Sequence, residues 1–336
     1  MTISSLIRPS DPSSSSRLRT LAVVVPCYRV REKICCVVES LLEVADFVIV
    51  VDDACPEHSG AYLQETLSHP KLTLLFHEKN QGVGGALVTG FQEALRLNAD
   101  IIVKMDGDGQ MDARYLPRLI APLVKGRADF AKGNRFFDLH ALQSMPFIRR
   151  VGNLGLTLLT KAASGYWNIS DPTNGYLAVR KDALALVNLH LLDRRYFFEI
   201  SLLIQLNVIR ALAVDIPIPA KYDDEQSSLS PLKILFSFPG KLLRGLIHRV
   251  WWRYFIYDIN IVTIFLVTGI LFFVGGGIFG AWRWGLNTTH EVHQSAGTVA
   301  LAMLPMILGF QMLLQAVVLD TLQQPERPLS DKLEMD

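Results

Sequence analysis

The chain has 336 residues, of which 50% are hydrophobic and 19% are charged, and its formal net charge is +1. This length accommodates one large domain or two, and the near-zero net charge gives no indication of a nucleic-acid partner. The four cysteines, Cys27, Cys35, Cys36 and Cys55, form no C-x-x-C pair. Their spacing argues against a zinc or disulfide framework and favours reduced thiols in a cytoplasmic domain.

Residues 1–20 contain four consecutive serines and two prolines, but no apolar segment typical of a secretory signal peptide. We expect them to form a disordered tail. From residue 21 onward, short apolar runs alternate with helical patterns, which predicts a mostly parallel, doubly wound α/β sheet. The predicted strands are 21–25, 47–51, 72–76, 101–103 and a proline-containing edge strand, 211–218. The predicted helices include 32–42, 90–97 and 196–206.

Two carboxylates follow the predicted strand 101–103. Asp106 and Asp108 stand one residue apart in the segment Asp106-Gly107-Asp108-Gly109-Gln110. They therefore lie at the carboxyl end of a strand, where open α/β sheets bind ligands. Hard oxygen ligands on a flexible loop suit Mg²⁺ or Mn²⁺, which proteins usually hold through one or two carboxylates together with substrate phosphates. The alternative is a solvated acidic turn, because Asp and Gly are common turn residues.

Polar groups also follow the other predicted strands. Pro26-Cys27-Tyr28 follows the first strand and Asp52-Asp53 follows the second. After the third strand, the glycine-rich turn at residues 80–86 opens a helix. Such a turn can bring backbone N–H groups and a helix N-terminus to an anion. Its position after the third strand, rather than the first, argues against a nicotinamide-dinucleotide site.

Taken in order, these motifs resemble family 2 glycosyltransferases of the GT-A fold, over residues 21–230. The segments that carry the resemblance are Val24-Val25-Pro26-Cys27-Tyr28, Val51-Asp52-Asp53, Asn80-Gln81-Gly82, Asp106-Gly107-Asp108-Gly109-Gln110, Gly133-Asn134-Arg135, Asp171-Pro172-Thr173-Asn174-Gly175-Tyr176 and Tyr196-Phe197-Phe198-Glu199. Residues 216–219 and 222–229 resemble the last soluble motif of the polyprenyl-phosphate (dolichol-phosphate-like) subgroup. The chain departs from the usual pattern at Cys55, where Ser is common, and at Ser228, where Lys is common.

The resemblance implies a membrane-anchored inverting glycosyltransferase that moves a sugar from a UDP- or GDP-linked donor to polyprenyl phosphate. It implies that Asp106, Asp108 and Gln110 hold Mg²⁺ or Mn²⁺, which neutralises the leaving diphosphate. The residues implied to contact the nucleotide sugar are Pro26, Tyr28, Glu32, Asp52, Asp53, Gly82, Asp106 and Asp171. The implied catalytic residues are Asp108, Arg135 and Glu199. The fork of Arg135 suits phosphate oxygens, and Glu199 is the candidate general base.

Several of these residues have structural alternatives. These are a surface salt bridge for Arg135, a helix cap for Asp52 or Asp53, a turn for Asp171, and orientation of a basic residue for Glu199. A second acceptor class, a hydroxyl on a lipid-linked or growing polysaccharide, would need a general base. The non-catalytic alternative is a nucleotide-sugar-sensing subunit of a membrane transport complex, which would not need a metal at the leaving group.

Two uncharged segments, 259–282 and 296–319, each contain 24 residues. About 20 apolar residues span a hydrocarbon core of about 30 Å, so we predict a two-helix transmembrane hairpin over residues 258–320. Residues 231–257 interleave apolar and basic side chains, which is typical of amphipathic helices in a membrane interface. Their positive charge predicts that the catalytic domain and both termini, including the tail 321–336, are cytoplasmic.

The second predicted span carries Gln311 and Gln315, which are four residues apart and therefore share one helix face. Amides in hydrocarbon are costly unless they are paired, so we expect this face to hold a homo-oligomer together. Gly275-Gly276-Gly277 and Gly280 on the first span would permit close helix approach. The alternatives for the glutamines are pairing within the hairpin and a path for the lipid acceptor.

Overall fold

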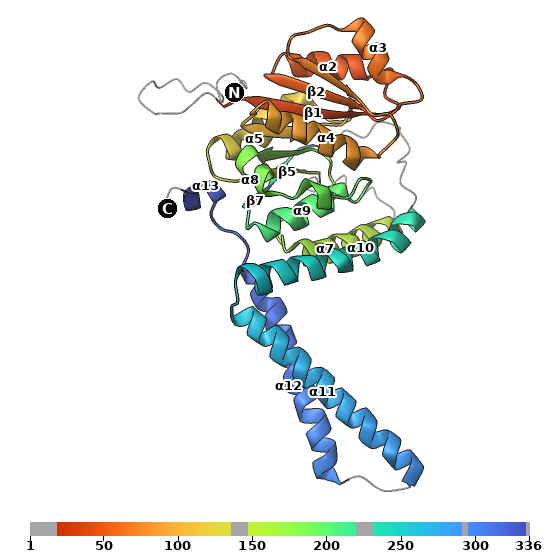
Figure 1. The fold of residues 1–336 in the computed structure, drawn as a ribbon, viewed down its shortest axis with the longest axis vertical. Coiled ribbons are helices and arrows are strands. Elements are labelled where there is room, and N and C mark those ends of the chain that lie inside the picture. Colours follow the sequence, from red (N-terminus) through yellow and green to blue (C-terminus); the bar gives the residue numbers. More distant parts are fainter. Residues whose placement is uncertain (1–18, 136–146, 220–230, 291–294, 334–336) are drawn as a thin grey trace. The chain divides into compact units, whose positions relative to one another are not determined.

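The computed structural model describes residues 19–135, 147–219, 231–290 and 295–333 (Figure 1). Nearly all of the predicted tail, 1–20, the motif at 222–229, the inter-span residues 291–294 and the last three residues lie outside this part of the chain. The chain divides into two compact units. One contains the residues up to Arg249 together with those from Pro325, and the other is Val250–Gln324.

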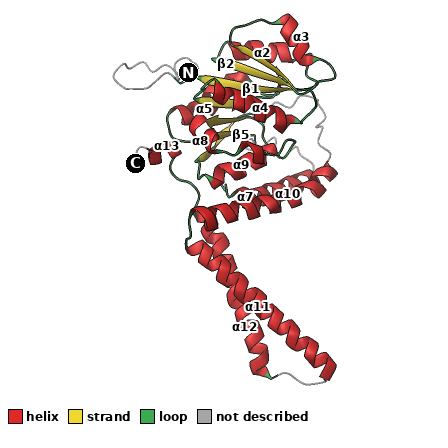
Figure 2. Ribbon diagram, viewed as in Figure 1, coloured by secondary structure: helices red, strands yellow, loops and turns green. Residues whose placement is uncertain are grey.

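A seven-stranded sheet lies at the centre of the first unit (Figure 2). Its strands are β1 (Leu21–Cys27), β2 (Phe47–Asp52), β3 (Leu72–Phe76), β4 (Ile101–Lys104), β5 (Phe130–Asn134), β6 (Leu177–Arg180) and β7 (Ala213–Pro217). Their order across the sheet is β3-β2-β1-β4-β6-β5-β7. Among the described strands, β6 alone runs antiparallel to its neighbours. The mostly parallel sheet predicted from the sequence is therefore confirmed, and β7 is the edge strand expected near residues 211–218.

Helices cover both faces of this sheet. Helices α4 (Val83–Arg96), α8 (Lys181–Leu186) and α9 (Phe198–Val208) pack on one face, and α2 (Ile34–Leu42), α3 (Ser59–Thr66) and α5 (Leu116–Val124) pack on the other. On β1, Ala22 and Val24 face the first set of helices, whereas Val23 and Val25 face the second. Burial on both sides explains why β1 is a continuous apolar run rather than an alternating one.

The structure corrects the predicted end of the first strand. The strand was predicted to cover residues 21–25, before Pro26, but β1 continues to Cys27. Val24 O accepts a hydrogen bond from Met105 N–H, and the ladder between β1 and β4 ends at this point. Alternate residues of a parallel strand bond to opposite neighbours. The backbone nitrogen of Pro26 therefore points to the side of β1 on which β4 has already ended. An N–H there would have had no partner on β4, so the proline removes no hydrogen bond from the ladder.

Two further helices of the first unit, α7 (Phe147–Ser164) and α10 (Pro231–Trp251), pack against α9 (Figure 1). Phe238 and Leu242 of α10 join a small buried cluster with Ala163 of α7. The guanidinium of Arg249 is buried and donates to the backbone oxygens of Ala162 and Ala163 at 3.1 and 3.0 Å. Arg249 therefore satisfies carbonyls at the end of α7, which otherwise lack intrahelical partners.

After the second unit, the chain returns to the core of the first. Helix α13 (Leu329–Leu333) begins with Leu329, which is 8% exposed and belongs to the main apolar cluster. The backbone N–H of Leu329 donates to both carboxylate oxygens of Asp129, at 3.0 and 3.1 Å. Asp129 directly precedes β5. The C-terminal segment is thereby attached to the base of that strand.

The second unit is a helical hairpin formed by α11 (Ile261–His290) and α12 (Ala296–Leu322), preceded by a π-helical segment, Trp252–Tyr257. Ile261–Leu286 and Ala296–Leu322 are long and apolar enough to cross a membrane. A Cβ added at Gly276 would lie 2.8 Å from Ala302 O, whereas one added at Gly275 or Gly277 would meet nothing within 4 Å. Gly276 therefore allows close approach within the hairpin. Gln311 and Gln315, by contrast, are exposed on α12.

Candidate active site

The parallel strands β1, β2 and β4 end at one edge of the sheet and present polar residues there. Cys27 pairs with Asp52 in parallel register, and Val24 pairs with Lys104. Asp106 therefore lies just beyond the end of β4, at the same edge as Asp52. This juxtaposition agrees with the position expected of a ligand site in an open α/β sheet.

Asp106 contacts a buried ammonium group. Its side chain is 29% exposed, and its Oδ1 lies 3.1 Å from Nζ of Lys104. The same Nζ lies 2.9 Å from Oε1 of Glu199 on α9. Burial by itself would lower the pKa of Lys104, but the carboxylates of Asp106 and Glu199 outweigh burial and raise this pKa above its usual value. Lys104 is therefore charged at neutral pH and bridges the two carboxylates.

Asp108 and Gln110 complete the loop after β4. Gln110 N–H donates to Oδ1 of Asp108 at 3.0 Å, and Gly109 between them has a φ of 75°, which favours glycine. In the part of the chain that the structure describes, no group of three or more His, Cys, Asp or Glu side chains could hold a metal ion. Asp106 and Asp108 nevertheless supply the hard oxygen donors that Mg²⁺ and Mn²⁺ prefer. This donor set fits a cation whose coordination is completed by a diphosphate.

Asp52 shapes the loop after β2. Its Oδ1 accepts a hydrogen bond from Cys55 N–H and its Oδ2 accepts one from Gly60 N–H, both at 2.7 Å. Gly60 lies in the first turn of α3, so Asp52 satisfies a backbone donor at that helix N-terminus. Asp52 is 5% exposed. A direct contact between Asp52 and the nucleotide stays a prediction.

Asp53 holds the glycine-rich turn before α4. Its carboxylate accepts the backbone N–H groups of Gln81 at 2.8 Å and Gly82 at 2.7 Å. Gly82 has a φ of 88°, and a Cβ there would overlap the carbonyl oxygen of Arg194. A Cβ at Gly84 would also overlap the backbone around Arg194. These glycines are therefore required by the close passage of another backbone segment, and the predicted contacts of Asp53 and Gly82 with the nucleotide sugar stay predictions.

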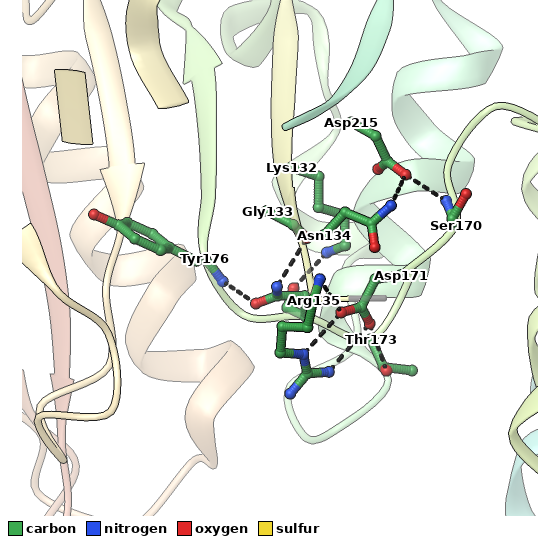
Figure 3. A network of polar contacts seen from close by, with 10 residues as sticks. Lys132, Gly133, Asn134, Arg135, Ser170, Asp171, Thr173, Tyr176 and Asp215 are labelled. Carbon is green, nitrogen blue, oxygen red and sulfur yellow. Dashed lines mark hydrogen bonds and ion pairs between the residues drawn. The ribbon is translucent and has the colours of Figure 1, made fainter. Parts of the chain in front are cut away.

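Arg135 follows β5 and forms a bidentate ion pair with Asp171 (Figure 3). Its Nε donates to Oδ2 of Asp171 at 2.8 Å, and its Nη2 donates to Oδ1 at 3.1 Å. The side chain of Asp171 is fully buried, whereas that of Arg135 is 38% exposed. The buried carboxylate therefore orients the guanidinium while part of it remains accessible, which a salt bridge between two surface side chains would not achieve.

A buried polar network attaches the loop before β6 to β5 (Figure 3). Nζ of Lys132 donates to Asn174 O at 2.5 Å, and Nδ2 of Asn174 donates to Gly133 O at 2.8 Å. Nδ2 of Asn134 donates to Oδ2 of Asp215 on β7 at 2.8 Å. Burial lowers the pKa of Lys132 to about 8 and raises the pKa of Asp215. The network therefore holds in place the loop that carries Asp171, the partner of Arg135.

Pro26, Tyr28 and Glu32 lie at the end of β1 and in the turn that follows it. Pro26 is partly buried, whereas Tyr28 is 41% exposed and Glu32 is also exposed. Exposure leaves these two side chains accessible to a ligand at the sheet edge. Their contacts with a nucleotide sugar stay predictions.

The sequence patterns missed two buried lysines of the site. Lys104 ends an otherwise apolar strand two residues before Asp106, and Lys132 lies on β5, directly before Gly133. A lysine at the end of a buried strand is itself a signal, because a buried charge requires a partner. One of the two carboxylate partners of Lys104, Glu199, is 95 residues away along the chain. No local pattern could reveal this pairing.

Comparison with known proteins identifies the family. The sequence profile of glycosyl transferase family 2 matches residues 22–186. The UDP-N-acetylglucosamine–dolichyl-phosphate N-acetylglucosaminyltransferase of Methanococcus voltae is 30% identical over 192 residues, which cover 53% of this chain and 76% of that protein. The polyprenol monophosphomannose synthase of Mycolicibacterium smegmatis is 30% identical over 203 residues, which cover 57% of this chain and 74% of that protein.

Among solved structures, glucosyl-3-phosphoglycerate synthase from Mycobacterium tuberculosis, in complex with Mn²⁺, uridine diphosphate and glucosyl-3-phosphoglycerate, has the same fold. Its TM-score is 0.50 at 18% identity, over 77% of this chain and 86% of that one. The GT-A fold implied by the sequence motifs is thereby confirmed. The profile match, the two relatives and the mostly parallel sheet together show that the chain is a glycosyltransferase and belongs to glycosyl transferase family 2.

Proposed function

We propose that the protein is a membrane-anchored, inverting glycosyltransferase that transfers a sugar from a nucleotide sugar to polyprenyl phosphate. The observation that carries this proposal is the relation of Asp106 to Arg135. Asp106 follows β4 and Arg135 follows β5. These two strands flank β6, run in the same direction and end on the same side of the sheet. This arrangement supports a site that handles two phosphate-containing groups, one on the donor and one on the acceptor. The relatives named for dolichyl phosphate and polyprenol monophosphomannose support the same acceptor class.

On the donor side, Asp106, Asp108 and Gln110 bind the cation that accompanies the diphosphate of a UDP- or GDP-linked sugar. When bound, Mg²⁺ or Mn²⁺ supplies positive charge that stabilises the departing diphosphate. A relative of the same fold has been solved with both Mn²⁺ and uridine diphosphate, which supports this combination. The other residues proposed to bind the nucleotide sugar or shape its pocket are Pro26, Tyr28, Glu32, Asp52, Asp53, Gly82 and Asp171.

On the acceptor side, Arg135 binds the phosphate of the lipid, and Asp171 orients the guanidinium. An oxygen of this phosphate attacks the anomeric carbon of the sugar from the side opposite the diphosphate. The bond between the anomeric carbon and the diphosphate oxygen breaks, and the nucleoside diphosphate leaves with the electron pair. Such a displacement inverts the anomeric carbon. No proton has to be removed from the acceptor, because a phosphate monoester has already lost a proton at neutral pH.

The alternative acceptor, a hydroxyl of a lipid-linked or growing polysaccharide, would need a general base. Glu199 is the predicted base, but it is paired with Lys104 at 2.9 Å and its side chain is only 11% exposed. One oxygen of the Glu199 carboxylate is thus engaged by an ammonium group, and little of the side chain can be reached by an acceptor hydroxyl. The geometry of Glu199 therefore favours the phosphate acceptor. Membership of a glycosyltransferase family argues against the sensing subunit of a transport complex.

Exposed apolar side chains support membrane anchoring. On α7, Leu154, Leu158 and Leu159 are 71%, 56% and 53% exposed, and on α10, Leu243 and Ile247 are 57% and 61% exposed. Contiguous exposed apolar surface marks interaction sites, and amphipathic helices of this kind bury their apolar face in a membrane interface. The apolar helices α11 and α12 come after α10 in the chain, separated from it by the π-helical segment. We propose that 231–257 is interfacial and 258–320 spans the bilayer.

The docking of Leu329 supports a two-span topology. Helix α10, before the hairpin, and Leu329, after it, both belong to the unit that contains the sheet. A chain that leaves a unit, enters a membrane and returns to the same unit crosses the membrane an even number of times. Because the flank before α11 is basic, we propose that the catalytic unit and both termini are cytoplasmic.

The experiment is a transfer assay with the full-length protein in detergent. A panel of radiolabelled UDP- and GDP-linked sugars is offered with undecaprenyl phosphate or with undecaprenol, the same lipid without its phosphate. The proposal predicts organic-soluble label with the phosphate only, and a loss of about 100-fold or more in kcat/KM for Arg135→Met, because a charged phosphate contact is removed. Equal labelling of undecaprenol, or transfer only to a polysaccharide, would overturn the proposed acceptor.

A further inference from the structure

The contact between Lys104 and Asp106 involves both oxygens of the carboxylate. Nζ of Lys104 lies 3.1 Å from Oδ1 and 3.4 Å from Oδ2. The ammonium therefore occupies the fork of the carboxylate, where a cation bound through both oxygens would lie. Gly175 closes the space on another side, because a Cβ there would be 2.7 Å from Oδ2 of Asp106 and would overlap Nζ of Lys104. Lys104 is thus enclosed rather than free to swing away.

The charges around Asp106 leave little attraction for a cation that arrives alone. Lys104 neutralises much of the Asp106 charge, and Glu199 faces the buried side of the same ammonium. A second buried lysine, Lys132, lies on the same face of the sheet, because Lys104 and Lys132 pair with Leu177 from opposite sides. Asp108 is the other predicted carboxylate ligand at this loop.

We infer that Lys104 makes cation binding at Asp106 and Asp108 depend on the nucleotide diphosphate. By engaging Asp106, Lys104 keeps the affinity for a free divalent cation low. The negative charges of a bound diphosphate then restore the affinity, so the cation and the nucleotide bind together and leave together. This role, which rests on the proposed function, makes Lys104 a positioning residue that acts through Asp106. Glu199 is its second partner and limits how strongly Lys104 holds that carboxylate.

The test measures Mn²⁺ binding to the full-length protein by electron paramagnetic resonance, with no nucleotide, with uridine diphosphate or with guanosine diphosphate. Wild type is expected to bind Mn²⁺ weakly alone and at least about 100-fold more tightly with one of the two diphosphates, which corresponds to about 2.7 kcal/mol. In Lys104→Met, binding of Mn²⁺ alone is expected to tighten about tenfold. Mn²⁺ binding to the diphosphate complex is expected to stay the same, so the coupling between Mn²⁺ and the diphosphate shrinks by the same factor.

A double variant tests whether misfolding, rather than the loss of the ammonium group, explains the effect of Lys104→Met. Lys104→Met leaves Glu199 buried without its partner, which destabilises the fold. Lys104→Met/Glu199→Gln removes both charges, and it should still tighten binding of Mn²⁺ alone, although by less than Lys104→Met because a nearby negative charge is lost as well. Glu199→Gln by itself should have the opposite effect, because Lys104 then pairs with Asp106 alone. Lys132→Met is the matched control, since Lys132 is an equally buried lysine whose Nζ donates to a backbone oxygen. It should change Mn²⁺ affinity less than about threefold.

The outcomes separate this inference from the proposed function. If wild type couples Mn²⁺ to a diphosphate, but Lys104→Met and the double variant show unchanged coupling, the role of Lys104 is wrong and the cation site stands. Equal weakening of Mn²⁺ binding with and without nucleotide would also overturn it, because that result indicates a purely structural lysine. If wild type binds no Mn²⁺ under any condition, both the proposed cation site and the role inferred for Lys104 are wrong.

Discussion

Gly175→Ala is a small change at the centre of the proposed site. The added methyl group would lie 2.7 Å from Oδ2 of Asp106 and 2.9 Å from Cε of Met111, and it would overlap Nζ of Lys104. Lys104 cannot retreat freely, because its Nζ is also held by Glu199 at 2.9 Å. Overpacking of this kind typically costs about 1–3 kcal/mol. Ordinary contacts begin at 3.4 Å, so we expect the Lys104–Asp106 pair to shift by close to 1 Å, and a displacement of this size at a catalytic group costs about 100-fold in rate.

The assay compares transfer to undecaprenyl phosphate with thermal unfolding. For Gly175→Ala we expect a fall of about 100-fold in kcat and a fall of about 4–8 °C in Tm, which corresponds to about 2 kcal/mol in a domain of this size. Gly155→Ala is the matched control, because Gly155 is exposed within α7 and a Cβ there meets nothing within 4 Å. Its activity should be unchanged and its stability equal or higher. Wild-type kcat in Gly175→Ala would refute the close packing of Gly175 on the Lys104–Asp106 pair.

Four other predictions follow from the site and the hairpin. Asp108→Ala, or EDTA added to wild type, should abolish transfer; full activity without added metal would contradict the cation site. The pKa of Lys132 is lowered to about 8 in the folded state, below the usual 10.5, so the unfolded chain binds more protons between these values. The unfolding free energy of wild type should therefore rise by about 2 kcal/mol relative to Lys132→Met between pH 8 and pH 10, and parallel pH profiles would refute this. A cysteine introduced at Asn287 should react with an impermeant thiol reagent from outside intact cells; labelling only after lysis would contradict the topology. Gln311→Leu/Gln315→Leu should reduce the mass of the detergent-solubilised protein if this exposed face holds a homo-oligomer, whereas an unchanged oligomer would exclude that role.

The central strands could be predicted from sequence because burial on both faces makes them continuous apolar runs. β1, β2 and β4 have this pattern, and their ends carry the acids that indicated the site. β5 and β6 could not be predicted in the same way. β5 contains Lys132, Gly133 and Asn134 within five residues, and β6 has only four residues. Their extended conformation depends on pairing with each other and with β4 and β7, which no local pattern contains.

The site could be predicted in its chemistry but not in its internal connections. Asp106 was indicated by its residue type and its position after a strand, whereas Arg135 and Asp171 were indicated by the resemblance to family 2 glycosyltransferases. The sequence did not indicate that Arg135 pairs with Asp171, or that Lys104 joins Asp106 to Glu199. These contacts link residues from different strands, loops and helices. They are set by packing of the whole sheet rather than by spacing along the chain.

The acceptor is tested most directly by the structure of the product. Full-length protein, a nucleotide sugar that supports transfer and undecaprenyl phosphate are incubated, and the organic-soluble product is examined by ¹H and ³¹P nuclear magnetic resonance. The proposed function predicts a phosphodiester that joins the anomeric carbon to the lipid phosphate, with the anomeric configuration opposite to that of the donor. A product with retained configuration, or a glycosidic bond to a hydroxyl, would contradict direct attack by a lipid phosphate held at Arg135.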